Sequence, residues 1–205
     1  MSRISVIMPV YNGVDFIRRA LPPLVAMQAR GEVLEVIVVD DGSTDDTVAV
    51  AQGLGARTTH SGGRLGPGGA RNAAAREAAG DILWFVDADV VVHDDAALAI
   101  ARAFDEKGVV AVFGSYDEHP PAQNFFSQYK NLVHHYYHQN AQEEAQTFWS
   151  GCGAVDREAF LAVDGFDVDT YKYPSIEDID LGHRLLAAGG ALRLRREVQC
   201  THLKV

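Results

Sequence analysis

The chain has 205 residues, enough for one domain with a full core, and its 47% hydrophobic and 22% charged residues are typical of a soluble globular protein. A formal net charge of −10 argues against a nucleic-acid-binding protein and favours divalent cations as partners. No apolar run approaches the roughly 18 residues of a membrane span, and no secretory leader precedes the first strand, so a cytoplasmic location is predicted.

The first half alternates strand-like and helical runs, the pattern of a parallel sheet with helices on its faces. Proline at 22 and 23 is expected to bend or break the first helix. Ser43, Thr44 or Asp45 can cap the second helix. The predicted strands cover residues 4–10, 34–40, 56–59 and 82–92, and the predicted helices cover 15–30, a segment after residue 45, and 69–79.

The second half is more mixed, and one domain without repeats or linkers is expected. Cys152 and Cys200 lack metal-ligand spacing and are predicted to be reduced structural thiols. The predicted helices cover 94–106, an aromatic segment at 124–140, and 177–188; a strand is expected at 109–115 and two short strands end at Thr201.

Pairs of aspartates follow two predicted strands, at 40–41 and within the run "FVDAD". Ligands of open α/β sheets bind outside the carboxyl ends of the strands. In a strand, Asp87 and Asp89 would project to the same side. Two neighbouring carboxylates need a cation, a proton or water, and a divalent metal carrying a phosphorylated ligand suits such a pair. Simple turn formation or helix capping is the alternative.

Two further segments at strand ends suit a nucleotide. In "PVYNG", Pro9 removes a backbone donor and Tyr11 offers a flat face for a nucleobase. In "VDDGSTDDT", an aspartate can accept a hydrogen bond from a base imino group, although capping competes. The loop "GGRLGPGGARN" allows close backbone approach and leads into a helix N-terminus, with Arg71 available to a phosphate.

A third acidic group lies near the C-terminus. Glu177, Asp178 and Asp180 occupy the first turn of an amphipathic helix. Acidic residues suit that place electrostatically, but three exceed what capping requires, and one could act as a general base. His202, beyond a strand, is either structural or completes a metal site begun by a distant carboxylate.

Six motifs, "PVYN", "VVDDGSTD", "GGARN", "FVDAD", "FWSGCGA" and "EDIDLGHRL", stand in this order along the chain. Together they resemble a family 2 glycosyltransferase of the GT-A fold, over a span from Ile4 to about Lys204. The resemblance implies a single α/β domain with a Rossmann-like, mostly parallel sheet flanked by helices. The implied domain consists of a nucleotide-sugar-binding half (1–115) and an acceptor-binding half (116–205). It further implies an inverting enzyme that uses a UDP- or GDP-sugar and Mn²⁺ or Mg²⁺.

The resemblance also implies roles for single residues. Asp178 matches the catalytic base, Asp89 the residue that binds the metal, and His202 a metal ligand found in some members. Asp87 is expected to hold ribose or a metal-bound water. Nucleotide contacts are implied for Pro9, Tyr11, Asp41 and Arg71. Trp149 and the "SGCGA" loop with Gly151 match a wall between donor sugar and acceptor, and Glu177 is expected in the same acceptor and donor-sugar pocket.

The acceptor, a hydroxyl or a phosphate, is not identified by these motifs; a lipid-linked molecule and a glycan are both open. The aromatic helix has three interpretations: a helix packed on the sheet with its histidines toward water, a surface near a membrane or lipid-linked acceptor, or a metal cluster at His134, His135 and His138.

Two other classes of protein and one architectural question stay open. A sugar nucleotidyltransferase would carry a glycine-rich loop directly after the first strand, where this chain has "YNGVDF". A non-catalytic nucleotide-sugar-binding module is the other class. Because similar enzymes often continue into membrane helices, we hypothesise a catalytic domain cut from, or naturally lacking, a membrane segment, and acting at the cytoplasmic face of a membrane.

Overall fold

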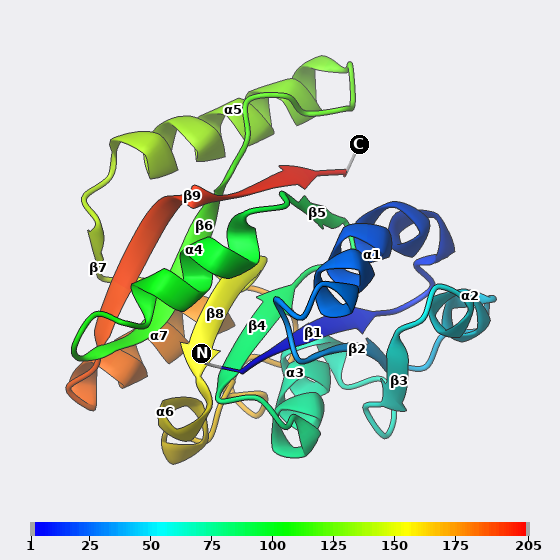
Figure 1. The fold of residues 1–205 in the computed structure, drawn as a ribbon, viewed down its shortest axis with the longest axis horizontal. Helices are drawn as coiled ribbons and strands as arrows, with labels where there is room; N and C mark the ends of the chain where they lie inside the picture. The colour runs from blue at the N-terminus through cyan, green and yellow to red at the C-terminus, as the bar shows by residue number, and fades with distance from the viewer. Residues whose placement is uncertain (1–2, 204–205) are drawn as a thin grey trace.

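A computed structural model describes residues 3–203 of the protein; Lys204, the end of the resemblance, lies outside them. A central sheet of nine strands organises this part of the chain (Figure 1). The strands are β1 (Ile4–Val10), β2 (Glu35–Asp40), β3 (Arg57–His60), β4 (Ile82–Val86), β5 (Val90–Val92), β6 (Val109–Tyr116), β7 (Glu144–Ala145), β8 (Cys152–Asp156) and β9 (Ala191–His202).

The sheet order is β3-β2-β1-β4-β8-β6-β9-β5, with β7 paired to β9. The first-half strands β3, β2, β1 and β4 are parallel, as expected, whereas β8 joins β4 and β6 antiparallel. Every residue of β1 is buried, because both faces of the sheet are covered.

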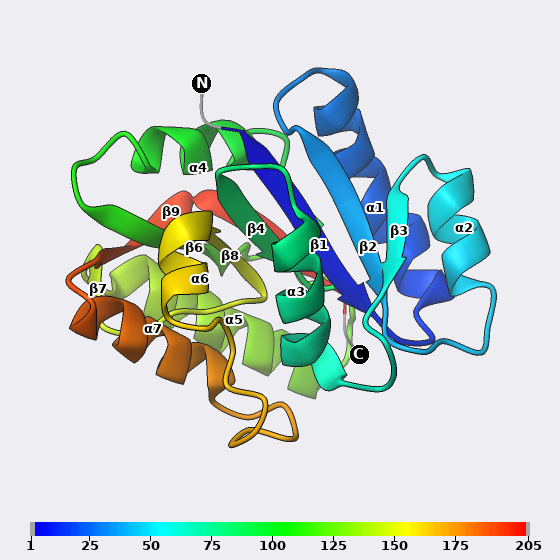
Figure 2. The ribbon, with the colours of Figure 1, turned by 90° about the horizontal axis from the view of Figure 1, so that it is seen from below.

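Helices cover the two faces as separate groups (Figure 2). One core contains α1, α2 and α4, and the other contains α3, α6 and α7. The helices are α1 (Val14–Ala29), α2 (Thr47–Gly53), α3 (Gly66–Glu77), α4 (Ala96–Ala103), α5 (Phe125–Asn140), α6 (Arg157–Ala162) and α7 (Glu177–Ala187). In residues 3–203, no helix has the length and apolar character needed to cross a membrane.

Helix α1 continues through Pro22 and Pro23, so of the two predicted effects, a bend or a break, the break is wrong. The two carbonyls that lose their helical partner belong to Arg18 and Arg19, which are exposed and within reach of water. On the opposite side the helix buries an apolar stripe, which holds it on the sheet. The stripe consists of Ile17, Ala20, Leu21, Leu24 and Met27.

The run from residue 82 to 92 is not one strand. It is β4, a turn and β5, and the amide of Val90 donates to the carbonyl of Asp87 across the turn at 3.0 Å. The expected strand geometry of Asp87 and Asp89 is therefore wrong. Near the C-terminus, the two short strands expected before Thr201 form one strand, β9, which pairs with β5, β6 and β7.

Helix α5 lies along β6 and β9 (Figure 1), with His134 exposed, as one of the interpretations expected, and with His135 and His138 turned toward the protein. His135 contacts the carbonyl of Tyr116 through Nδ1 at 2.7 Å, and His138 packs against Phe113 and Trp149. Burial lowers the pKa of His138 to about 4. Large aromatic residues face outward instead: Phe125, Phe126, Tyr129, Tyr136 and Tyr137.

Candidate active site

A cavity of about 430 Å³ opens at the edge of the sheet where β1 and β4 end. Because β8 runs antiparallel to β4, with Cys152 opposite Val86, its start lies at the same edge. The N-terminus of α7 and the first turns of α3 complete the wall. The lining residues are Pro9, Val10, Tyr11, Asn12, Gly13, Phe16, Pro67, Arg71, Asp87, Ala88, Asp89, Trp149, Ser150, Gly151, Pro174, Ser175, Glu177 and Asp178.

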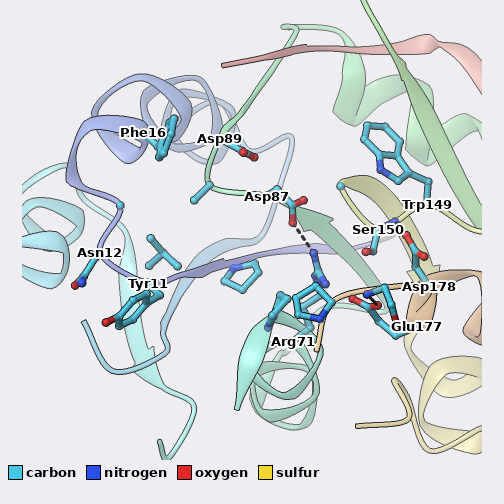
Figure 3. Close-up of a pocket in the computed structure, with 18 residues that line it drawn as sticks. Tyr11, Asn12, Phe16, Arg71, Asp87, Asp89, Trp149, Ser150, Glu177 and Asp178 are labelled. Atoms are coloured by element: carbon cyan, nitrogen blue, oxygen red, sulfur yellow. Dashed lines mark hydrogen bonds and ion pairs between the residues drawn. The ribbon is translucent and has the colours of Figure 1, made fainter. Parts of the chain in front are cut away.

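Arg71 and Asp87 form an ion pair in the middle of this cavity (Figure 3). Nη2 of Arg71 lies 2.5 Å from Oδ1 of Asp87, and the Arg71 side chain is only 3% exposed. In the part of the chain that the structure describes, the buried Nε of Arg71 has no hydrogen-bond partner. Burial raises the pKa of Asp87; the charge of Arg71 opposes this shift and that of Asp89 adds to it. The turn therefore presents one carboxylate already held by a buried guanidinium.

Asp89 lies on the other side of the turn, next to the last residue of β9. The pairing of β5 with β9 sets Val90 opposite His202. This pairing brings Nε2 of His202 to 3.5 Å from Oδ2 of Asp89. The His202 ring also stacks on Tyr116, with 4.9 Å between ring centroids and 19° between planes. A carboxylate and an imidazole from distant parts of the chain thus face one another.

Asp89 and His202 could supply two of the ligands of a divalent cation, but not a complete ligand set. Across residues 3–203, no group of three or more His, Cys, Asp or Glu side chains is placed to hold a metal ion. The histidine cluster considered for α5 is therefore not formed. Mg²⁺ in proteins is usually bound by one or two carboxylates together with substrate phosphates. A donor set of Asp89 and His202 suits a cation that a diphosphate helps to bind.

Tyr11 lies at the opposite end of the cavity from Trp149 (Figure 3). Its side chain is partly exposed, and Cζ of Arg64 lies 3.7 Å from the ring centroid. Arg64 comes from the glycine-rich loop, so this loop and the end of β1 form one surface. A cation above an aromatic ring is an attractive arrangement worth about 0.5–1 kcal/mol at exposed sites.

Asp41 is outside the cavity and binds the glycine-rich loop. Its Oδ1 accepts from Oγ of Ser61 at 2.7 Å and from the amide of Leu65 at 2.9 Å, and its Oδ2 accepts from the amide of Gly66 at 2.9 Å. An ionised carboxylate offers about four acceptor positions. Asp41 thus has a structural role here, and its predicted contact with a base stays a prediction.

The segment before β8 forms the wall nearest to α7. The amide of Asp87 donates to the carbonyl of Gly151 at 3.0 Å, which ties this wall to the aspartate turn. A side chain at Gly151 would collide with the indole of Trp149, whose atoms lie 2.6–2.8 Å from the position of an added Cβ. Trp149 also packs edge-on against Tyr116 at 4.9 Å between centroids. Glycine at 151 is therefore required for the orientation of Trp149.

The three acids of α7 have three different environments. Oδ2 of Asp178 accepts from the amide of Ser150 at 3.3 Å and faces the cavity. Glu177 accepts from the amide of Ser175 at 2.7 Å. Asp180 pairs with Arg184 at 2.8 Å and does not line the cavity. Burial raises the pKa of Asp178, the Ser150 amide opposes the shift, and the charge of Glu177 adds to it.

The structure brings together most of the residues singled out from the sequence. The cavity contains Pro9, Tyr11, Arg71, Asp87, Asp89, Trp149, Gly151, Glu177 and Asp178, and His202 joins through Asp89. The contributors that were missed include Arg64 over Tyr11, Tyr116 under His202, and Asn131 beside His202. Arg64 could have been found, since it belongs to the same glycine-rich loop as Arg71. The other two have no sequence signal beyond their places in an apolar strand and an aromatic helix.

The family profile described as "Glycosyl transferase family 2" matches residues 5–163, which is more than half of the chain. The chain belongs to this family. The family 2 match includes the ends of β1 and β4 and the start of β8, so it covers the aspartate turn and the Trp149 wall.

The names of several similar curated relatives refer to poly(ribitol-phosphate). The beta-N-acetylglucosaminyltransferase TarS of Staphylococcus aureus is 33% identical over 114 residues, which are 52% of this chain and 19% of TarS. A beta-glucosyltransferase of Bacillus spizizenii is 36% identical over 105 residues, 47% of this chain and 16% of that protein. The matched region spans less than a fifth of each of these relatives.

Solved structures share the fold. A mannosyltransferase of Pyrobaculum calidifontis in complex with GDP-Man and Mn²⁺ superposes with a TM-score of 0.77 at 24% identity, covering 98% of this chain and 56% of that one. GalNAc-T7 with UDP, GalNAc and Mn²⁺ gives a TM-score of 0.78 at 16% identity, covering 100% and 44%. The GT-A fold expected from the sequence is confirmed, as a mixed α/β single domain.

Proposed function

We propose that this family 2 domain transfers a sugar from a UDP- or GDP-sugar to an acceptor hydroxyl or phosphate, with inversion and with a divalent metal. The observation that carries the proposal is Asp178, a largely buried carboxylate with a raised pKa, facing the cavity that also contains the Asp87–Asp89 turn. Nucleotide-sugar and Mn²⁺ complexes of proteins with the same fold support the donor and the metal. The named relatives support a glycan or polymer acceptor in cell-envelope synthesis.

The donor is proposed to lie along the cavity, with its base toward Tyr11 and its sugar toward Trp149 (Figure 3). Pro9 belongs to the same nucleotide end, next to which Asp41 holds the glycine-rich loop from outside the cavity, and Arg71 and Asp87 lie between the two ends. Asp89 and His202 would hold Mn²⁺ or Mg²⁺, which when bound supplies positive charge to a departing diphosphate. The nucleotide end is built by residues 1–115, whereas Trp149, Gly151, Glu177 and Asp178 belong to the proposed acceptor half, 116–205.

Asp178 is proposed to act as the general base when the acceptor is a hydroxyl. The acceptor oxygen forms a bond to the anomeric carbon while the bond from that carbon to the diphosphate oxygen breaks on the opposite face. The acceptor proton moves to the Asp178 carboxylate, which the Ser150 amide orients.

NMR of the product's anomeric configuration tests inversion. Cytoplasmic location and association with a membrane through a further segment stay predictions.

A thermal-shift screen tests the proposed function. UDP, GDP and their sugars are each added with and without Mn²⁺ or Mg²⁺ to the parent protein and to Asp89→Ala. A ligand that binds only the folded state raises stability by RT ln(1 + [L]/Kd). We expect one nucleotide to raise the melting temperature of the parent only with metal, and Asp89→Ala to lose this response.

Asp94→Ala is the matched control, since the Asp94 side chain is 87% exposed and does not line the cavity. It should respond as the parent does. A parent protein that no nucleotide stabilises under any metal condition would contradict the proposed function. Release of pyrophosphate from a nucleoside triphosphate and a sugar phosphate would instead indicate a nucleotidyltransferase.

The acid limb of the pH profile should depend on Glu177. The raised pKa of Asp178 means that the carboxylate is protonated at a higher pH than the ordinary aspartate value of about 3.9. As the pH is lowered, activity should therefore begin to fall at a pH above this ordinary value. Glu177→Gln removes a negative charge that raises this pKa, so the acid limb of kcat/KM should move to lower pH. Asp180→Asn should leave it in place; a limb that moves upward in Glu177→Gln would refute the assignment.

A further inference from the structure

His202 is held by contacts that act on different parts of its imidazole. The stack on Tyr116 fixes the plane of the ring. Stacking does not distinguish the ring from the same ring turned by 180°, and it does not choose which nitrogen carries the proton. The orientation of the ring and the position of its proton decide whether a nitrogen lone pair or an N–H group faces Asp89. A polar partner at the other nitrogen is needed to set them.

Asn131 of α5 provides this partner. Its Oδ1 lies 3.1 Å from Nδ1 of His202, across 71 residues of sequence. Asn131 is 3% exposed, and within residues 3–203 its buried Nδ2 has no hydrogen-bond partner. An amide oxygen can only accept a hydrogen bond, so Nδ1 of His202 is the protonated nitrogen in this arrangement. Nε2 then carries the lone pair, and this is the atom 3.5 Å from Asp89.

The position of Asn131 is fixed by the way in which α5 docks. Asn131, His135 and Gln139 follow one another at four-residue spacing and share one side of the helix. His135 contacts the carbonyl of Tyr116 at 2.7 Å, and Nε2 of Gln139 donates to Oγ of Ser115 at 3.2 Å. This polar stripe attaches α5 to the end of β6, directly beside the ring that stacks on His202. Asn131 is thus presented by an element with two other attachments.

We propose that Asn131 is a positioning residue for the metal site: its amide oxygen holds His202 as the Nδ1–H tautomer and directs the Nε2 lone pair toward a divalent cation beside Asp89. The inference rests on the proposed function, in which Asp89 and His202 hold that cation. Partners of the second nitrogen of a metal-binding histidine fix its tautomer and orientation, and their removal typically weakens metal binding about 10- to 100-fold. The same amide turned by 180° would present its NH₂ group and require the opposite tautomer.

Three variants separate these possibilities. Asn131→Leu removes the acceptor at similar volume. Asn131→Asp keeps an acceptor and removes the amide donor. Gln139→Leu is the matched control, because it removes another member of the same polar stripe without touching His202.

The first measurement is ¹⁵N NMR of His202 without metal, at about two pH units above the ordinary histidine pKa of about 6.5. The parent, Asn131→Asp and Gln139→Leu should have the proton on Nδ1, and Asn131→Leu should lose this preference. A proton on Nε2 in the parent would overturn the inference, and this result does not depend on whether any variant folds. An unchanged tautomer in a folded Asn131→Leu protein would also overturn it.

The second measurement is the affinity for Mn²⁺, alone and with UDP or GDP, from the electron paramagnetic resonance signal of free Mn²⁺. Asn131→Leu should bind about 10- to 100-fold more weakly than the parent, whereas Asn131→Asp and Gln139→Leu should retain binding. If Asn131→Asp loses binding as Asn131→Leu does, the amide nitrogen is the contact and the inference fails. A parent with the expected tautomer that binds no Mn²⁺ under any condition refutes the metal site of the proposed function instead.

Discussion

Replacing Asp178 by asparagine is expected to lower kcat by about 10²- to 10⁴-fold, the usual contribution of a general base, while the donor Kd stays near that of the parent. Asparagine preserves the shape and can still accept from the Ser150 amide, but it cannot take a proton from an acceptor hydroxyl. Because Asp178 lies at the Trp149 end of the cavity, away from Tyr11, its loss should not disturb the nucleotide (Figure 3). Steady-state kinetics and donor titration measure the two quantities separately.

Asp180→Asn is the control for this experiment. It makes the same chemical change two residues along the same helix, at a side chain that pairs with Arg184 instead of lining the cavity. Its kcat should remain within a few-fold of the parent. If Asp178→Asn weakens donor binding as much as it lowers kcat, Asp178 binds the donor and is not the base.

Gly114→Ala is expected to destabilise the folded protein by about 1–3 kcal/mol or more, the range for overpacking a filled interior. A Cβ at Gly114 would overlap the carbonyl oxygen of Val198 and would lie 2.9 Å from Cγ1 of the same residue. The oxygen belongs to the backbone of β9, so the clash is relieved only by separating β6 from β9 near the irregularity between Phe113 and Ser115. The free energy of unfolding from urea denaturation measures the effect.

Gly53→Ala provides the comparison. Gly53 ends α2 with open space around the position of an added Cβ, and alanine is favoured over glycine in helices by up to about 1 kcal/mol. This variant should be as stable as the parent or slightly more stable. A Gly114→Ala protein with unchanged unfolding free energy would show that β9 can move away from β6 at little cost.

The carboxylates of the site were predictable because their position follows from a general rule. Parallel strands direct their carboxyl ends to one edge, so "PVYN" and "FVDAD" had to meet once β1 and β4 were recognised as neighbours. The acids of α7 were recognisable from their excess in one helical turn. These features depend on local sequence and on the alternation of elements.

The shape of the aspartate turn could not be predicted in the same way. The turn is held by the amide of Asp87 donating to Gly151, 64 residues later in the chain. Strand β8, "CGAVD", is short and lacks alternation, and it becomes a strand only because β4 and β6 offer edges on both sides. Asp41 shows the same limit, since its attachment to Leu65 and Gly66 depends on how the glycine-rich loop folds back.

The late position of β9 has a consequence for how the protein is made. The chain is synthesised from its N-terminal end, and a nascent chain that has emerged only through α7 contains Asp87, Asp89 and Asp178 but neither His202 nor the strand that pairs with β5. Such a chain presents an unpaired edge of β6, the kind of edge that promotes association with other chains. The aspartates of the cavity are thus synthesised before the strand that covers β6 and carries His202, and association with other chains is most favoured in that interval.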